Sequence, residues 1–182
     1  MNVNPEREGE APADPNALNK VQRELHPPVK TSSPVRKHPA HGVYISAVNP
    51  TIVFLTVCCD KRQPWLANDR HHELLLDIWQ DTSHWVVGRH VLMPDHLHLF
   101  AAPQESALSL ETWVKYWKSK FTKRNKNPIC HWQTDHWDTR MRSKEHYEEK
   151  SEYMFNNPVR ASLVSDRNQW KFQGVVHEIP WD

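Results

Sequence analysis

Apolar residues are sparse in the first 42 positions of this 182-residue chain and become periodic after them. Segment 51–59 is a continuous apolar run rich in β-branched residues, which predicts a buried strand. Segments 85–87 and 91–101 are expected to form further strands, and Pro103 is expected to end the last one. Segment 66–79 carries leucine, isoleucine and tryptophan at helical spacing and predicts a helix.

Two more helices are predicted in the second half of the chain. Segment 109–125 begins with Ser109, a residue type that caps helix N-termini, and its apolar stripe consists of Leu110, Trp113, Trp117 and Phe121. The charged segment 143–152 also favours a helix. This mixture indicates an α+β domain with a single antiparallel sheet and helices packed against one face.

The first 42 residues are expected to be a disordered extension, because they are polar and contain seven prolines. Residues 43–182 then form one domain. No apolar stretch is long enough to predict a secretory signal or a membrane span. The chain has three cysteines, of which Cys58 and Cys59 are adjacent, and this favours a reducing cytoplasm over a disulfide framework. In a strand these two would face opposite sides, one of them toward the core.

His96 and His98 lie two positions apart in a predicted strand. Side chains alternate between the two faces of a strand, so both imidazoles point the same way while Leu97 and Leu99 point into packing. Such a pair supplies two-thirds of a compact metal site. The simpler alternative is a half-exposed strand with two solvated histidines, since the chain contains 13 histidines.

Tyr153 and Asn157 follow the charged helical segment. Residues four apart share one face of a helix, so the phenol and the amide are expected to project together before Pro158 ends the regular hydrogen bonding. The alternative for Tyr153 is an ordinary helix aromatic packed against the sheet.

These segments resemble the REP-associated tyrosine transposases, which are single-tyrosine members of the HUH nuclease superfamily. The resemblance covers residues 43–172. Its motifs are Met93-Pro94-Asp95-His96-Leu97-His98, then Trp132-Gln133 and His136-Trp137-Asp138 before Arg140 and Arg142, and finally Tyr153 with Asn157-Pro158-Val159-Arg160. Ser162 stands where the family often has glycine, at the exit of the helix.

The resemblance implies a ferredoxin-like, RRM-like HUH fold with Tyr153 as the nucleophile. It implies that His96, His98 and Asn157 bind Mg²⁺ or Mn²⁺. The implied substrate is single-stranded DNA that folds into a hairpin, such as a REP-like palindrome, which is cut and rejoined through a 5′-phosphotyrosine. The protein is expected to act as a monomer or a homodimer.

The net charge of +1 does not by itself indicate a nucleic-acid partner, but the charges are unevenly distributed. A stretch without acidic residues contains Lys115, Lys118, Lys120, Lys123, Arg124 and Lys126. This helix is expected to contact phosphates, the alternative being an ordinary solvated helix face. Arg140 and Arg142 are further candidate DNA contacts, and the neighbouring Trp132 and Trp137 are candidates for stacking on unpaired bases.

Two other functions remain open from the sequence. One is a DNA-binding regulator that keeps the fold but has no catalytic activity. The other is a metal-dependent hydrolase in which His96 and His98 act with water as the nucleophile. In the hydrolase Tyr153 would be dispensable.

Overall fold

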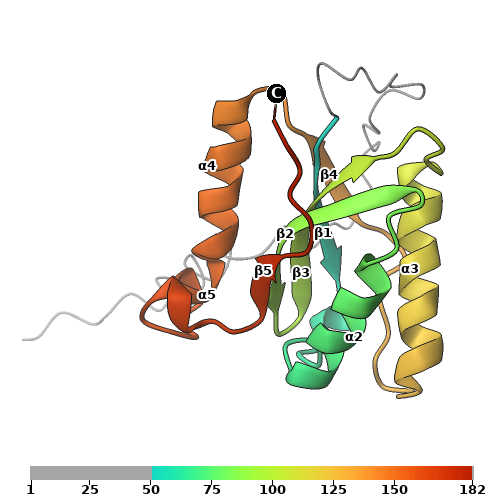
Figure 1. Ribbon diagram of the computed structural model, residues 1–182. Helices are drawn as coiled ribbons and strands as arrows, with labels where there is room; N and C mark the ends of the chain where they lie inside the picture. The colour runs from blue at the N-terminus through green and yellow to red at the C-terminus, as the bar shows by residue number, and fades with distance from the viewer. Residues whose placement is uncertain (1–50, 182) are drawn as a thin grey trace, which may run out of the picture. The chain divides into compact units, whose positions relative to one another are not determined.

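The computed structural model describes residues 51–181, so the expected disordered segment 1–42 lies outside the described residues. The elements, in chain order, are β1 (Val53–Cys58), the 3-10 turn η1 (Asp60–Arg62), α2 (Asp69–Trp79), β2 (Trp85–Met93), β3 (His96–Pro103), α3 (Leu110–Asn125), β4 (Trp137–Arg140), α4 (Lys144–Phe155), α5 (Asn157–Arg160), the 3-10 turn η2 (Arg167–Gln169) and β5 (Gln173–Val175) (Figure 1).

The five strands form one antiparallel sheet with the order β4-β1-β3-β2-β5. The first four strands, together with α2 and α3, follow the βαββαβ pattern of the ferredoxin-like fold, and β5 extends the sheet beside β2. The predicted α+β class and the single antiparallel sheet are therefore confirmed. The strand β3 occupies the centre of the sheet and carries the two histidines.

Helices α2 and α3 pack on one face of the sheet (Figure 1). The apolar stripe of α3 is buried there as predicted, through Trp113, Trp117 and Phe121. Ser109 caps this helix by accepting a hydrogen bond from the backbone N–H of Thr112. We call this side of the sheet the α2/α3 face.

Helix α4 covers the opposite face, which we call the α4 face (Figure 1). The prediction that all helices pack against one face is therefore wrong. Although α4 is mostly charged, it buries Tyr147, Ser151 and Met154, which recur every three or four residues. The Tyr147 ring packs 4.6 Å from that of Phe100, measured between centroids, and anchors α4 to β3.

The expected strand 91–101 is interrupted by a tight turn at Pro94 and Asp95, which separates β2 from β3. The predicted strand 85–87 joins the residues before that turn to form β2, with a register shift between Val87 and His90. Pro103 ends β3 as predicted.

All three cysteines are free and buried. Cys59 belongs to the core of the α2/α3 face, whereas Cys58 points to the other side and receives a hydrogen bond from Arg62, which confirms that the two residues face opposite ways. Within residues 51–181, none of the helices combines the length and the apolar character that crossing a membrane requires.

Candidate active site

The imidazoles of His96 and His98 lie on the α4 face of the central strand, with ring centroids 4.8 Å apart. Their relative exposures are 9% and 7%, so the alternative of two solvated histidines is wrong. Leu97 and Leu99 are buried in the core on the other side of β3, as the alternation predicts. Burying two adjacent imidazoles requires partners for their nitrogens, and these partners come from β1 and the β2–β3 turn.

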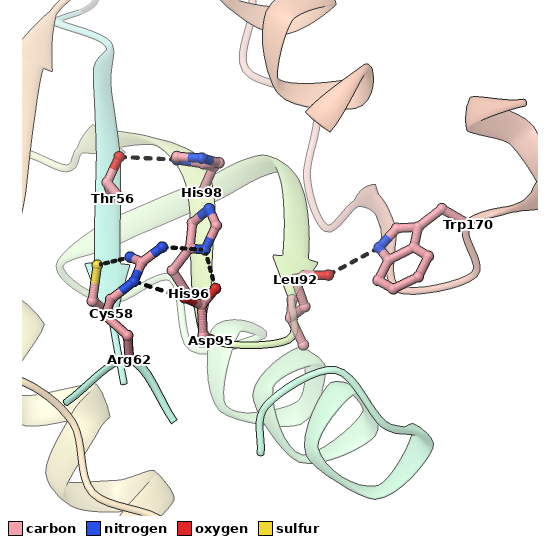
Figure 2. A network of polar contacts seen from close by, with 8 residues as sticks. All are labelled: Thr56, Cys58, Arg62, Leu92, Asp95, His96, His98 and Trp170. Carbon is pink, nitrogen blue, oxygen red and sulfur yellow. Dashed lines mark hydrogen bonds and ion pairs between the residues drawn. The ribbon is translucent and has the colours of Figure 1, made fainter. Parts of the chain in front are cut away.

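His98 is held by two residues of β1. Its Nδ1 lies 2.9 Å from Oγ1 of Thr56 (Figure 2). Its ring also stacks on Phe54, with centroids 5.2 Å apart. Burial lowers the pKa of His98 well below its usual value, and the positive charges of His96, Arg62 and Lys150 lower it further. When Nδ1 donates its hydrogen to Thr56, the lone pair of this neutral ring lies on Nε2, where a metal would bind.

His96 is held by the residue before it. Nδ1 of His96 lies 2.7 Å from Oδ1 of Asp95, and the second carboxylate oxygen of Asp95 lies 2.7 Å from Nε of Arg62 (Figure 2). Arg62 also donates to Sγ of Cys58 at 2.8 Å, and its Nη2 lies 3.3 Å from Nδ1 of His96. A carboxylate that accepts from Nδ1 fixes the tautomer whose Nε2 lone pair can bind a metal.

Arg62 follows β1 in a strained turn. Lys61 and Arg62 both have positive φ, at 50° and 57°, a conformation that costs a residue with a side chain about 1–2 kcal/mol. The turn places the guanidinium against Asp95, Cys58 and His96. Sequence reasoning missed this residue, because 34 positions separate Arg62 from His96 and nothing in the local pattern joins them.

Tyr153 lies near the end of α4, with its ring centroid 6.5 Å from that of His98. It is 41% exposed, whereas the alternative of a tyrosine packed against the sheet expects a buried ring. The next residue, Met154, is fully buried and anchors this turn of the helix to the sheet. The structure therefore brings the predicted nucleophile and the predicted histidine pair to one place on the α4 face.

Asn157 follows Tyr153 by one helical turn, because Asn156 between α4 and α5 keeps a right-handed helical conformation. Nδ2 of Asn157 is buried and has no hydrogen-bond partner within residues 51–181. Rotating the amide by half a turn puts its oxygen in that position, where it can bind a cation. Ser162, beyond α5, has a φ of 55°, which explains physically why glycine suits this position.

Two imidazoles and one amide oxygen are a donor set that fits a hard or borderline divalent cation with open positions for water and phosphate. Residues 51–181 contain no cluster of three or more His, Cys, Asp or Glu side chains arranged to bind a metal. A site built from these residues therefore needs Asn157 or the substrate to complete it.

The basic residues predicted on α3 are placed differently from the expectation. Lys118 is buried, and its ammonium donates to the backbone carbonyls of Gln133 and Thr134, so the prediction that it contacts phosphate is wrong.

Three other basic residues of α3 form ion pairs with carboxylates: Lys115 with Glu111, Lys120 with Asp81, and Arg124 with Asp77. Lys123 is exposed. The whole helix lies on the α2/α3 face, on the other side of the sheet from Tyr153.

The two tryptophans proposed to stack on bases differ in their surroundings. Trp132 is packed into the α2/α3 core, 4.9 Å from Trp65 between ring centroids, so the proposal that it stacks on bases is wrong. Trp137 is 38% exposed and pairs with Thr56 across β4 and β1, which places it on the α4 face in the same row as His98. Arg140 and Arg142 are exposed at the end of β4 and just after it.

No family model matches the sequence, and no curated protein matches it. Among solved structures, the chain is similar to a REP-associated tyrosine transposase bound to a REP hairpin, with 19% identity over 78% of this chain and 82% of that chain, and a TM-score of 0.62. A Deinococcus radiodurans R1 protein described as a transposase matches over 66% of this chain and 97% of that chain, with 16% identity and a TM-score of 0.43. The first similarity shows that this chain shares the fold of the REP-associated tyrosine transposase.

Proposed function

We propose that this protein cleaves and rejoins hairpin-forming single-stranded DNA through a covalent bond between Tyr153 and a 5′ phosphate. The observation that carries the proposal is the position of Tyr153. An exposed phenol ring lies 6.5 Å from the ring of His98, on the face where His96 and His98 are buried side by side.

The exposed phenol oxygen would attack the phosphorus atom of the scissile phosphodiester. A bond forms between this oxygen and phosphorus while the bond from phosphorus to the 3′ oxygen breaks. The phenol proton passes to solvent and the departing 3′ oxygen takes up a proton, so no proton is consumed overall. The phosphotyrosine bond keeps the energy of the broken phosphodiester, so a 3′-hydroxyl can later rejoin the strand without a nucleotide cofactor.

His96, His98 and Asn157 would hold Mg²⁺ or Mn²⁺. When bound, this ion supplies Lewis-acid polarisation of the scissile phosphate. Thr56 and Asp95 would orient the two imidazoles, because each of them lies within hydrogen-bond distance of an Nδ1 atom.

A DNA hairpin is the partner that the fold comparison suggests, since the solved transposase of the same fold is bound to one. The exposed Trp137 offers an unpaired base a surface beside the histidine pair. Arg142 would contact the backbone of the same DNA. Arg140 pairs with Val53, whose side chain belongs to the α2/α3 core, so Arg140 points to the other face of the sheet.

The test uses labelled single-stranded hairpins from the flanks of the protein's own gene, incubated with Mn²⁺ or with EDTA. Products are separated on denaturing gels with and without protease digestion. We expect a metal-dependent, protease-sensitive adduct that the Tyr153→Phe variant does not form while it still binds DNA. Tyr116→Phe is the matched control, because Tyr116 is similarly exposed, at 39%, but belongs to α3 on the other side of the sheet.

Two outcomes would contradict the proposal. Metal-dependent cleavage that survives in Tyr153→Phe would show a hydrolase that uses water. Binding without cleavage of any flanking hairpin would show a DNA-binding regulator.

A further inference from the structure

Two cations flank the ring of Tyr153. Nζ of Lys150 lies 5.4 Å from the ring centroid, and Cζ of Arg160 lies 5.1 Å from it. Lys150 comes from α4, three residues before Tyr153, whereas Arg160 ends α5. Two separate segments therefore bring positive charge to the same phenol.

Lys150 also reaches toward the histidines. Its Nζ lies 5.8 Å from the centroid of the Phe54 ring, and Phe54 is the ring that stacks on His98. The ammonium is thus close to both the exposed phenol and the aromatic pair that holds one imidazole. A phosphate that approaches both Tyr153 and His98 would meet this charge.

Neither cation is neutralised by a carboxylate within residues 51–181. This differs from most basic residues around them, because Arg89 is paired with Glu148, Arg167 with Glu152, and Arg62 with Asp95. Helix α4 contains Glu145, Glu148, Glu149 and Glu152, so acidic side chains are plentiful beside Lys150. Positive charge that stays unpaired next to so many carboxylates is available to an anion from outside the protein.

We infer that Lys150 and Arg160 bind backbone phosphates of the DNA strand at Tyr153, with Lys150 on the scissile phosphate and Arg160 on a neighbouring one. This inference rests on the proposed function, because it names the substrate contacts of the same site. It also replaces α3 as the source of charge near the nucleophile, since α3 lies on the other face of the sheet. Ammonium and guanidinium groups in loose contact with a ring can turn to phosphate oxygens without breaking an ion pair.

Binding is measured separately from cleavage, so that the two proposals can fail independently. The Tyr153→Phe protein is titrated with a labelled hairpin that carries an unpaired flank, at several salt concentrations. Each lost phosphate contact lowers the slope of log affinity against log salt by about 0.7 on single-stranded DNA. We expect Lys150→Gln and Arg160→Gln each to lower the slope by that amount and the affinity about tenfold, and Lys150→Arg to restore both.

Two variants serve as matched controls. Lys144→Gln changes the first residue of the same helix, and Lys123→Gln changes an exposed lysine of α3. Both should keep the slope of the parent protein. An unchanged slope in Lys150→Gln and Arg160→Gln would overturn the inference and show that the two cations only pack against the ring.

A second measurement locates each contact on the DNA. A neutral methylphosphonate replaces the scissile phosphate or one of its neighbours, and binding is again measured in the Tyr153→Phe background. We expect Lys150→Gln to lose no further affinity on the DNA that is modified at the scissile phosphate. An equal loss from Lys150→Gln on every modified DNA would overturn the assignment of Lys150 to that phosphate.

Discussion

Oγ1 of Thr56 lies 2.9 Å from Nδ1 of His98, and the two residues face each other directly across β1 and β3. The strand pairing itself therefore supplies the group that orients the imidazole. Asp95, in the turn before β3, orients the ring of His96 in the same way. Each imidazole therefore has its polar contact at Nδ1, and Nε2 of each ring points away from that contact.

Replacing Thr56 with valine should weaken metal binding, because valine has a similar shape but no hydroxyl to orient His98. Loss of such an orienting group typically lowers metal affinity by about 10- to 100-fold. We expect a decrease of that size in the affinity for Mn²⁺, measured by electron paramagnetic resonance without DNA. Thr139→Val on β4 is the control, and equal affinities in the two variants would show that Thr56 does not orient the ring.

Lys118 should contribute to stability and not to DNA binding. Lys118→Ala removes a buried ammonium that donates charged hydrogen bonds to the backbone carbonyls of Gln133 and Thr134, which should lower the free energy of unfolding by about 2–3 kcal/mol. Lys115→Ala, which removes only an exposed ion pair with Glu111, should change it by less than about 0.5 kcal/mol. Urea unfolding measures both, and similar values for the two variants would contradict the assignment.

Trp137 should bind an unpaired base. Stacking on an exposed aromatic ring contributes about 1–3 kcal/mol per base, so Trp137→Ala should weaken binding of hairpins with unpaired flanks by about tenfold or more. Trp137→Phe should keep much of the affinity. A fully paired hairpin without flanks is the control substrate, and an equal loss on it would argue against stacking on a base.

His72 of α2 and His90 of β2 should make the fold sensitive to acid. Their Nε2 atoms lie 2.9 Å apart, so one ring donates and the other accepts, and the two rings cannot both be protonated in this arrangement. Burial lowers the pKa of His90 from 6.5 to about 3. Burial also lowers the pKa of His72, although the negative charges of Asp69 and Glu73 act to raise it.

An imidazole with a lowered folded-state pKa stabilises the fold fully above its unfolded pKa and progressively less as the pH falls toward the folded value. Acidification from pH 6.5 to about pH 4 should therefore lower the free energy of unfolding by about 3 kcal/mol through His90. Urea unfolding at several pH values tests this expectation. His90→Gln should show a shallower dependence over that range, and an unchanged dependence would assign the acid sensitivity to other groups.

Features with local causes could be predicted from the sequence. The alternation around His96 and His98 places them on one face, and the helical spacing of Trp113 and Trp117 identifies the buried side of α3. The order of the predicted strands and helices was sufficient to predict the fold class. Each of these features depends on patterns among residues only a few positions apart.

Features that join distant segments could not be predicted. The sequence around Lys118 is that of an exposed lysine, and its burial depends on the loop at Gln133, which is distant in sequence. The carboxylates that pair with Lys120 and Arg124 come from residues 39 and 47 positions earlier. The role of Arg62 depends on a left-handed turn that its sequence does not encode in an obvious way. Helix α4 shows only a narrow apolar stripe, so its place on the second face of the sheet was not evident.

The tight turn at Pro94 and Asp95 limits how the chain can change in length. Inserting one residue into β3 between the turn and His98 would move His98 to the α2/α3 side and bring Leu97 or Leu99 outward, since a shift of one residue exchanges the two faces of a strand. Substitutions can accumulate in this hairpin while the site survives, but single-residue insertions and deletions cannot. The number of residues from Val91 to Phe100 is therefore under a stricter geometric constraint than most of their identities.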